Sequence, residues 1–412
     1  MKPKVNLSTK MFEGKAIQKN QFAAYKFGFF FSAPATHHLY YLLPLVRVTK
    51  ERIVIVFNAT EQYLTLIQNN FPDINFISLD IKNTAAIITQ LNKYSVLVFA
   101  NTYHWFVKEI QPNLSRKILL TRILHGASHK FADDRSYYLS SVFGGDVTIV
   151  HGAKDLDMFY DLLDFPRDQR SYADIVDANN GLGKSLTLMQ CGNLRAQDFF
   201  SSKFSKTLLM EKYNYIDPNK KTILVMPTHT NNPSNSKVDY SSLTYLTDLL
   251  EAMEDADEYN FLFKLHPNLI FHDEMRERLI EVCNRKNIRI PNDLYTADYF
   301  SLMSIADIMV TDRSSSVFDF LYFDKPIVFL DSTNEYLNDV KWNDLQNPFW
   351  SFQLGAVLSI DSNQGFSGII KSSLSQDNHK EIRKKVIEYA FRINPHAGSI
   401  LAALLAHPKL RP

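Results

Sequence analysis

Residues 308–331 read Ile308-Met-Val-Thr-Asp-Arg-Ser-Ser-Ser-Val-Phe-Asp-Phe-Leu-Tyr-Phe-Asp-Lys-Pro-Ile-Val-Phe-Leu-Asp331. An apolar strand comes first, a polar turn and a short helix follow, and Pro326 ends the helix before a second apolar strand. This order predicts a β-α-β unit. Its turn places Asp312, Ser314 and Ser315 at a helix start, where backbone N–H groups and the helix dipole favour an anion such as phosphate. Helix capping and turn closure explain the same residues, so both readings stay open.

The bulk composition is that of an ordinary globular protein. The chain has 412 residues, of which 45% are hydrophobic and 22% are charged, and this length favours two domains over a single core. Its 45 Lys and Arg residues against 44 Asp and Glu residues leave a net charge of +1. A global attraction to nucleic acid is therefore unsupported.

The cysteines and the polar start of the chain are typical of a cytoplasmic protein. Cys191 and Cys283 lie in separate apolar segments without metal-ligand spacing, as reduced core residues do. The start Met1-Lys-Pro-Lys-Val-Asn6 differs from a signal peptide, and no window reaches the roughly 18 apolar residues of a membrane span. We therefore expect a cytoplasmic protein that is able to rest on a membrane surface.

Short apolar runs alternate with longer amphipathic runs along most of the chain. In the first half we expect strands at residues 27–33, 52–57, 74–79, 95–100, 117–124, 146–150 and 186–190, and helices at 35–48, 61–69 and 84–92. A polar, Lys-rich link follows at residues 198–221. The second series has strands at residues 222–226, 260–265 and 288–290, helices at 241–256 and 272–286, and then the unit of residues 308–331.

The predicted fold is α/β, with two doubly wound, Rossmann-like domains that face each other across a cleft. Strands that alternate with helices predict parallel sheets covered by helices on both faces. We place the N-terminal domain at residues 1–205 and the C-terminal domain at residues 206–412. Late helices near residues 378–391 and 398–406 can pack back on the N-terminal domain.

Polar clusters follow five of the predicted strands. In open α/β sheets, ligands bind beyond the carboxyl ends of the strands, so polar residues count for more there. The five clusters are Leu124-His125-Gly126, Gly192-Asn-Leu-Arg195, Pro227-Thr228-His229, Lys264-Leu265-His266-Pro267 and Asp312-Arg313-Ser314-Ser315. Taken singly, His125 beside a glycine fits a turn and His266 before a proline fits a strand end. Taken together, the clusters indicate one ligand site.

The residue types in these clusters suit one class of reaction. Histidine titrates near neutrality, so it can take a proton from a hydroxyl or stabilise charge on a leaving phosphate. An arginine and a helix start suit a pyrophosphate, whose distributed charge needs several fixed donors. We infer transfer from a nucleotide-diphosphate donor to an alcohol.

Other motifs are weaker. Asp155-Leu-Asp157 and Asp255-Ala-Asp257 match the metal-binding Asp-x-Asp of some glycosyltransferases, but charged helix or turn faces explain them better, and we expect no metal ligands. The sequence has no Gly-x-Gly-x-x-Gly or Gly-Lys-Ser/Thr loop, so neither a dinucleotide fingerprint nor a Walker-type nucleotidase is supported. His37 and His38 follow the first strand, where an acceptor contact and a helix start fit equally well.

At these clusters the chain resembles the CDP-glycerol glycerophosphotransferase family, which includes teichoic acid primases and polymerases and their capsule relatives. Lys264-Leu-His-Pro267 matches the family's Lys-Leu-His-Pro, and Thr311-Asp-Arg-Ser-Ser315 is similar to its Thr-Asp-Tyr-Ser-Ser. Phe318-Asp-Phe320 and Lys325-Pro326 resemble the Phe-Asp-Tyr and Lys-Pro blocks. Looser matches are Leu124-His-Gly126 to Trp-His-Gly, Gly192-Asn-Leu-Arg195 to Gly-x-Pro-Arg, and Met226-Pro-Thr228 to Ala-Pro-Thr.

The resemblance implies a GT-B-like fold, a CDP-activated polyol as donor, no cofactor and no obligatory metal. It implies His125 and His266 as catalytic residues, with His125 as general base on the acceptor hydroxyl and His266 beside the departing CMP. The implied donor-binding residues are Arg195, Thr228, His229, Lys264, Asp312, Arg313, Ser314, Ser315 and Asp319. We expect Asp312 and Asp319 to support the turn or to contact the ribose. His37 and His38 are the acceptor-binding candidates.

The implied reaction moves glycerol phosphate or ribitol phosphate to a hydroxyl of a cell-surface glycan or lipid-linked acceptor and releases CMP. The acceptor implies peripheral attachment at the inner face of the cytoplasmic membrane. Leu124, Arg313 and His229 depart from the family pattern, which has Trp, Tyr and commonly Trp at these places. Since two of the departures add basic character, the donor can differ from CDP-glycerol in charge or size.

Other functions fit the same scaffold. One is a GT-B glycosyltransferase that uses a CMP- or UDP-sugar, such as a capsule sialyltransferase. A second is a nucleotide-sugar 2-epimerase, which would act without an acceptor, whereas a transferase needs one. A third is a nucleotide-binding protein without turnover.

Overall fold

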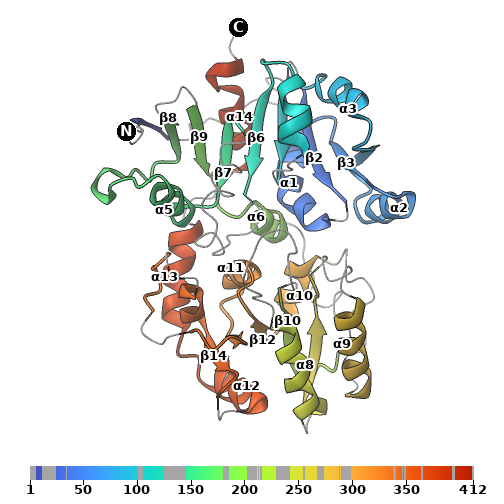
Figure 1. Ribbon diagram of the computed structural model, residues 1–412, viewed down its shortest axis with the longest axis vertical. Helices are drawn as coiled ribbons and strands as arrows, with labels where there is room; N and C mark the ends of the chain where they lie inside the picture. Colours follow the sequence, from blue (N-terminus) through green and yellow to red (C-terminus); the bar gives the residue numbers. More distant parts are fainter. Residues whose placement is uncertain are drawn as a thin grey trace. The chain divides into compact units, whose positions relative to one another are not determined.

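The computed structural model describes most of the chain as two α/β units (Figure 1). The described residues are 6–11, 25–33, 35–100, 105–124, 145–179, 185–201, 211, 213, 216–228, 242–253, 256–266, 273–286, 288, 298–336, 340–345, 347, 349–362, 365–391 and 395–410. Backbone contacts divide the chain into a first unit of Met1–His125, Asp134–Ser202 and Tyr389–Pro412, and a second unit of Gly126–Asp133 and Lys203–Glu388.

A nine-stranded sheet forms the centre of the described part of the first unit. Its strands are β1 (Asn6–Lys10), β2 (Phe27–Ser32), β3 (Ile53–Phe57), β4 (Asn75–Leu79), β5 (Val96–Phe99), β6 (Leu119–Ile123), β7 (Val147–Val150), β8 (Ile175–Asn179) and β9 (Ser185–Gln190). They lie in the order β1-β8-β9-β7-β6-β5-β2-β3-β4. Neighbours from β9 to β4 pair in parallel, whereas β8 is antiparallel to both β1 and β9.

Helices cover both faces of this sheet (Figure 1). They are α1 (Thr36–Val48), α2 (Glu61–Asn70), α3 (Thr84–Leu91), α5 (Ala153–Leu162), α6 (Leu194–Ser201) and α14 (Ala397–Leu405), with a π-helix η2 (Phe106–Ile110) and short 3-10 turns η3 (Gln111–Asn113), η5 (Arg167–Gln169) and η10 (Pro408–Leu410). The late helix α14 packs on α1, so the end of the chain belongs to the first unit.

The strand β2 shows why the apolar runs fold as they do. Successive side chains of a strand point to opposite faces, so a strand covered on both sides is apolar throughout. Phe29 and Phe31 lie in the cluster that includes α1 and α14, whereas Phe30 lies in the opposite cluster with Phe99 and Phe106. The ring of Phe30 stacks on that of Phe99, with centroids 4.9 Å apart.

Gly28 sits on the same face of β2 as Phe30. A Cβ atom placed on it would lie 2.8 Å from both the Leu97 and the Tyr94 side chains. At this position the Leu97 and Tyr94 side chains leave no space for a side chain on β2, and glycine is the residue that has none.

The second unit contains five described strands, all parallel. They are β10 (Lys221–Met226), β11 (Tyr259–Phe263), β12 (Ile308–Thr311), β13 (Ile327–Asp331) and β14 (Ala356–Ser359), in the order β11-β10-β12-β13-β14. The helices are α8 (Leu243–Ala252), α9 (Asp273–Arg285), α10 (Tyr299–Ile305), α11 (Ser316–Phe320), α12 (Phe366–Ser375) and α13 (Lys380–Phe391), with 3-10 turns η6 (Ala256–Glu258), η8 (Leu321–Phe323) and η9 (Trp350–Leu354). The last residues of α13, from Tyr389 onward, belong to the first unit.

The β-α-β unit expected at residues 308–331 is confirmed as β12, α11, η8 and β13. The elements that were not expected include the strands β1, β8 and β14 and the helices α6, α10 and α12. The strand expected at residues 288–290 is not seen at Ile288, and residues 289 and 290 lie outside the described residues. Cys191 and Cys283 are buried and unpaired, as expected of core thiols, and burial raises the pKa of each.

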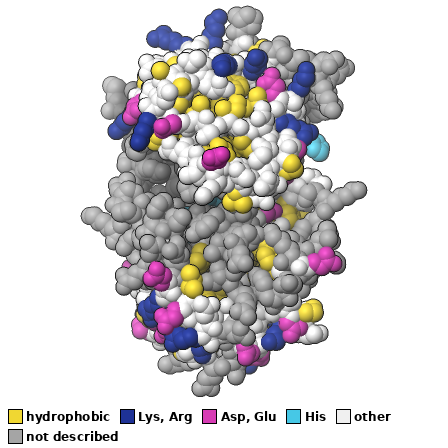
Figure 2. All heavy atoms as spheres, turned by 90° about the vertical axis from the view of Figure 1, so that its right-hand side faces the viewer, with side chains coloured by type: hydrophobic (Ala, Val, Ile, Leu, Met, Phe, Trp, Pro, Cys, Tyr) yellow, Lys and Arg dark blue, Asp and Glu magenta, His cyan; other side chains and the backbone are white. Residues whose placement is uncertain are grey.

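On the face shown in Figure 2, basic and acidic side chains of the described residues are interspersed, so neither charge dominates there. This agrees with the net charge of +1. In the described part of the chain, none of the helices has the length and apolar character needed to cross a bilayer.

Candidate functional site

The strand order of the second unit reverses beside β10. This strand precedes the other four in the sequence, and it pairs with β11 on one edge and β12 on the other. In open parallel sheets, a ligand crevice forms beyond the carboxyl ends of the strands at such a reversal. The predicted donor residues that follow these strands are Thr228 after β10, Lys264 and His266 after β11, and Asp312, Arg313, Ser314 and Ser315 after β12. The structure therefore brings them to one edge of one sheet.

Asp312 ties two of these turns together. Its side chain is buried, and its carboxylate accepts hydrogen bonds from the Thr228 N–H at 2.9 Å and 3.0 Å. The same carboxylate accepts the backbone N–H and the hydroxyl of Ser242, both at 3.2 Å, just before α8. Hydrogen bonds to a carboxylate are the stronger kind. Asp312 thus holds the turn after β10, the turn after β12 and the start of α8 in one arrangement.

Ser314 and Ser315 lie on the exposed side of the β12 turn, where both are partly accessible. The Ser314 hydroxyl lies 2.9 Å from the Ser316 hydroxyl and also accepts the Ser316 N–H at 3.4 Å, so it caps the chain entering α11. Ser315 precedes α11 and makes no capping bond with its side chain. Two hydroxyls beside a helix start can donate to phosphate oxygens.

Arg313 and Asp319 lie behind this turn in buried positions. The Arg313 guanidinium stands over the Phe349 ring, 5.1 Å from its centroid, which is a cation–π contact. Asp319 accepts a hydrogen bond of 2.6 Å from the Tyr299 hydroxyl. Both side chains are therefore engaged with the protein, and they fix the turn from inside while the Arg313 charge makes its surroundings more positive.

The first unit has its own reversal, between β2 and β5, because β3 and β4 extend the sheet on one side of β2 and β5 and β6 on the other. His37 and His38 lie in the first turn of α1, directly after β2, with ring centroids 4.1 Å apart. His38 is buried, whereas His37 is partly accessible. Of these two predicted acceptor-binding residues, His37 is therefore the one with accessible surface.

Arg195 lies in the first turn of α6, after β9. It is buried, and its guanidinium lies 4.4 Å from the centroid of the Tyr40 ring on α1. Gly192 precedes it with a φ of 63°, a left-handed conformation that glycine adopts without strain. The Asn193 side chain then accepts the Ala196 N–H at 3.1 Å and caps the helix.

Two of the predicted residues, His125 and His229, lie outside the described residues. Their roles as general base and donor contact stay predictions. The same holds for the catalytic role of His266, whose side chain is partly accessible at the edge of the second sheet.

His151 is a residue that sequence reasoning missed. It follows β7 directly, and its Nδ1 lies 2.8 Å from the Asp155 carboxylate, which also accepts the His151 N–H at 2.8 Å. The other oxygen of Asp155 lies 2.7 Å from the Lys154 ammonium, and all three side chains are buried. Burial opposes ionisation of Asp155, but Lys154 and His151 outweigh it and hold the pKa of that carboxyl well below its usual range.

A signal for His151 exists in the sequence. Ile149-Val-His-Gly152 has the same strand-His-Gly pattern as Ile123-Leu-His-Gly126. The ring of His151 faces Tyr41 and Phe391, with centroids 6.2 Å and 5.7 Å away. These surroundings make His151 part of the packing of the first unit.

The Asp155-Leu-Asp157 motif is not a charged surface face, contrary to the expectation from the sequence. Asp155 is engaged as described, and Asp157 accepts hydrogen bonds from Arg170 at 2.9 Å, from the Tyr172 hydroxyl at 2.6 Å and from the Tyr389 hydroxyl. Burial was the feature that the local pattern did not reveal. Within the described ranges, no group of three or more His, Cys, Asp or Glu residues is arranged to hold a metal ion.

The family model of CDP-Glycerol:Poly(glycerophosphate) glycerophosphotransferase matches residues 183–382. This match covers close to half of the chain and includes every described candidate after β9. The match confirms, over this region, the resemblance that the motifs carry. A search of curated protein sequences found no match.

Solved structures with a similar fold include the wall teichoic acid polymerase TagF, with a TM-score of 0.59 and 13% identity over 95% of this chain and 90% of that chain. An H444N variant of TagF was solved after a soak in CDPG. Another is Alr3699/HepE from Anabaena in complex with UDP and glucose, with a TM-score of 0.50 and 13% identity over 93% of this chain and 99% of that chain.

A third similar structure is the UDP-GlcNAc 2-epimerase from Neisseria meningitidis, with a TM-score of 0.51 and 16% identity over 92% of this chain and 99% of that chain. At these identities the likeness concerns the fold alone. The α/β, GT-B-like class predicted from the sequence is confirmed by these neighbours and by the two parallel-sheet units.

Proposed function

We propose that this chain, with its CDP-glycerol glycerophosphotransferase region at residues 183–382, transfers a polyol phosphate from a CDP-activated donor to a hydroxyl of an acceptor and releases CMP. The polyol is glycerol or ribitol. The observation that carries the proposal is the Asp312 carboxylate bridging β10 and β12 at the reversal of the second sheet, inside the matched region. Nucleotides bind open parallel sheets beyond the carboxyl ends of the strands at such a reversal, and Asp312 fixes the turns there.

The donor pyrophosphate is proposed to lie at the carboxyl edge of β10, β11 and β12. The hydroxyls of Ser314 and Ser315 would donate hydrogen bonds to phosphate oxygens, and Arg313 would raise the local potential from behind the turn. His266, which follows β11, would donate to the phosphate that leaves with CMP. The same reading assigns Arg195, Thr228, His229 and Lys264 to the donor.

The acceptor is proposed to bind the first unit, with His37 and His38 near its hydroxyl. His125 would take the hydroxyl proton while the acceptor oxygen bonds to the phosphorus that carries the polyol. The bond from that phosphorus to the bridging oxygen of the pyrophosphate would break, and CMP would leave with the electron pair. In this proposal residues 1–205 serve the acceptor and residues 206–412 serve the donor, with two exceptions: Arg195 is a donor residue, and α14 packs on the first unit.

A hydroxyl on a lipid-linked or glycan chain is the proposed acceptor. Peripheral attachment at the inner face of the membrane would bring the enzyme to such a chain. Binding to vesicles that carry the acceptor lipid, compared with vesicles without it, tests this attachment.

The decisive experiment measures CMP or UDP release from CDP-glycerol, CDP-ribitol, CMP-sialic acid and a UDP-sugar, each with and without an acceptor. Release of CMP from a CDP-polyol that depends on the acceptor supports the proposal. Nucleotide released from a UDP-sugar without acceptor would indicate an epimerase, and release from a CMP- or UDP-sugar with acceptor would indicate sugar transfer. Either result, without turnover of a CDP-polyol, would replace the proposed function.

Residue roles are tested with matched histidine variants. His266→Ala should lower turnover of the CDP-polyol by about 100-fold or more, the usual range for a proton-transfer residue. His396→Ala, which removes an exposed histidine before α14, should leave turnover unchanged. Equal rates in the two variants would remove His266 from the mechanism.

A further inference from the structure

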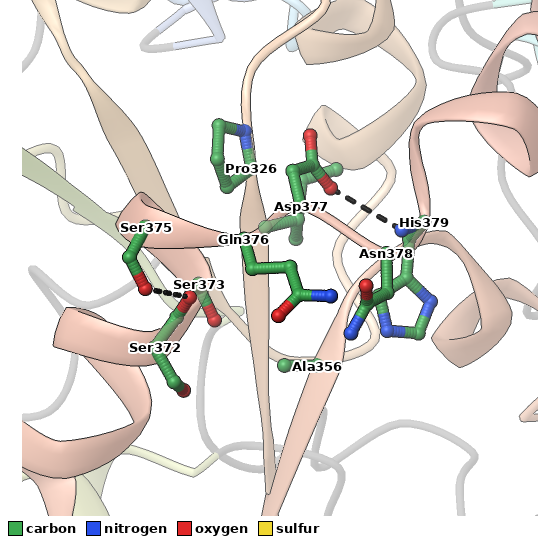
Figure 3. A pocket seen from close by; sticks show the side chains of 10 residues that line it. Pro326, Ala356, Ser372, Ser373, Ser375, Gln376, Asp377, Asn378 and His379 are labelled. Atoms are coloured by element: carbon green, nitrogen blue, oxygen red, sulfur yellow. Dashed lines mark hydrogen bonds between the residues drawn. The ribbon is translucent and has the colours of Figure 1, made fainter.

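A cavity of about 150 Å³ lies in the second unit, away from the donor residues (Figure 3). Pro326 and Ile327 at the start of β13 and Ala356 at the start of β14 give it an apolar floor. The last turn of α12 and the turn into α13 supply the remaining walls. Because the strands are parallel, the cavity lies at their amino ends, roughly 15 Å along a strand from the carboxyl edge where the donor residues lie.

Ser373 gives this cavity an unsatisfied polar group. The side chain is only 7% exposed, and its hydroxyl has no hydrogen-bond partner in the structure. Its neighbours on α12 differ, because the Ser372 hydroxyl donates to the Ile369 carbonyl at 3.0 Å and the Ser375 hydroxyl to the Ser372 carbonyl at 2.9 Å. A buried hydroxyl is normally paired, so one that lines a cavity without a partner indicates a missing ligand group.

The charge of the cavity wall disfavours an anion. Asp377 lines the cavity as a carboxylate, and both of its oxygens accept hydrogen bonds from the buried Arg383, one of them at 2.9 Å. Burial opposes ionisation of Asp377, but Arg383 outweighs it and lowers the pKa of that carboxyl. Among the described residues that line the cavity none is Lys or Arg, and the Arg383 guanidinium is already engaged. The Asp377 charge is balanced by Arg383, and a phosphate would therefore find no further cation among the residues that line the cavity.

His379 presents an acceptor to the same cavity wall. Its Nδ1 lies 3.0 Å from the Gln353 carbonyl, and a carbonyl only accepts, so Nδ1 carries the proton. In the neutral ring Nε2 is then an acceptor. Gln376 and Asn378 add amides that both donate and accept. In the view of Figure 3 the serines of α12 lie at the left, and His379 and Asn378 at the right.

These features define the ligand chemistry. Hydroxyls and amides that donate and accept, an imidazole acceptor and an apolar floor match a molecule with several hydroxyls on a short carbon chain. The volume fits about six non-hydrogen atoms, since a cavity of about 150 Å³ holds benzene. Glycerol has that size. We propose that this cavity is a second ligand site, separate from the transfer reaction, which binds the diol end of a small neutral polyol.

Two kinds of molecule carry such a diol: a free polyol, and a longer chain that ends in one. Saturation-transfer NMR on the full chain distinguishes them, with glycerol as the first probe and 3-methoxy-1,2-propanediol, whose third oxygen is blocked, as the second. Binding of both probes supports a chain terminus, and binding of glycerol alone supports a free polyol. Glycerol 3-phosphate should bind more weakly than glycerol, because the described residues that line the cavity include no Lys or Arg.

Two variants locate the site. Ser373→Leu fills the cavity and should weaken glycerol binding at least about tenfold, and Gln376→Ala, at an exposed position that folding tolerates, should weaken it several-fold. Ser201→Ala is the matched control, because that exposed hydroxyl on α6 donates to the Asp198 carbonyl of its own helix. No detectable binding of either probe, or equal binding by Gln376→Ala and the control, would overturn the proposal.

Discussion

Asp155→Asn is expected to destabilise the first unit by about 3–5 kcal/mol. The substitution keeps the shape of the side chain but removes the charge that lies 2.7 Å from Lys154 and 2.8 Å from His151. Lys154 has no exposed surface, so its ammonium would lose the carboxylate in a place that water does not reach. The loss is large because a buried charge is left uncompensated.

A double variant separates charge from shape. Replacing both members of a buried ion pair by apolar residues is often nearly neutral, whereas removing one member is costly. Lys154→Met combined with Asp155→Asn removes both charges but keeps a side-chain oxygen that accepts the His151 N–H, so it should recover most of the stability lost in Asp155→Asn alone. A double variant as unstable as the single one would assign the loss to packing instead of charge.

The pH dependence follows from the lowered pKa of Asp155. A carboxyl whose pKa is lower in the folded state stabilises the protein above its unfolded pKa, about 3.9 for an aspartate, and loses that contribution as pH falls through the folded value. The stability difference between the wild type and Asp155→Asn should therefore be constant near neutrality and shrink below about pH 4. A difference that grows in acid would contradict the charge state assigned to Asp155.

Urea unfolding monitored by hydrogen exchange provides the measurement, because exchange is read separately for peptides of each unit. Peptides from β7 and α5 should lose protection at lower urea in Asp155→Asn. Peptides from β12 and α11, in the second unit, serve as the internal reference. A shift below about 1 kcal/mol in the first unit, or an equal shift in both, would refute the reasoning.

The remaining predictions concern single contacts. Asp312→Ala should destabilise the second unit by about 2–5 kcal/mol, because two backbone N–H groups lose their acceptor, and urea unfolding of β12 peptides checks it. Gly152→Ala should cost about 1–3 kcal/mol, since its Cβ would lie 2.4 Å from the Ala390 carbonyl; an unchanged melting temperature would contradict this. Tyr389→Phe should cost about 1–3 kcal/mol through the lost bond to Asp157, again read from thermal melting.

The described parallel strands other than β14 were predictable because each is a short, mostly apolar run between turn residues. β2 and β12 are examples, and both are buried along most of their length. The strand β8, which lies between β1 and β9, and the edge strand β14 were not predicted. Their sequences, Ile-Val-Asp-Ala-Asn and Ala-Val-Leu-Ser, mix polar and small residues, and only pairing with a neighbour makes them strands.

The candidate donor residues were predictable from their place after strands, but their partners were not. Asp312 is bound to Ser242, 70 positions away, and no local pattern joins the two. His151 and Asp155 are one helical turn apart, so their contact was visible in principle. Its burial was not, because that depends on how Tyr41 and Phe391 pack around the ring.

Gly28 has a consequence for how the first sheet assembles. If β2 slipped by one residue along β5, a phenylalanine would arrive where Leu97 and Tyr94 leave no room for even one extra carbon. The phenylalanines on either side are alike enough to tolerate exchange, and the glycine is what distinguishes the correct alignment from the shifted one. The absence of a side chain at Gly28 thus restricts the register in which β2 can pair with β5.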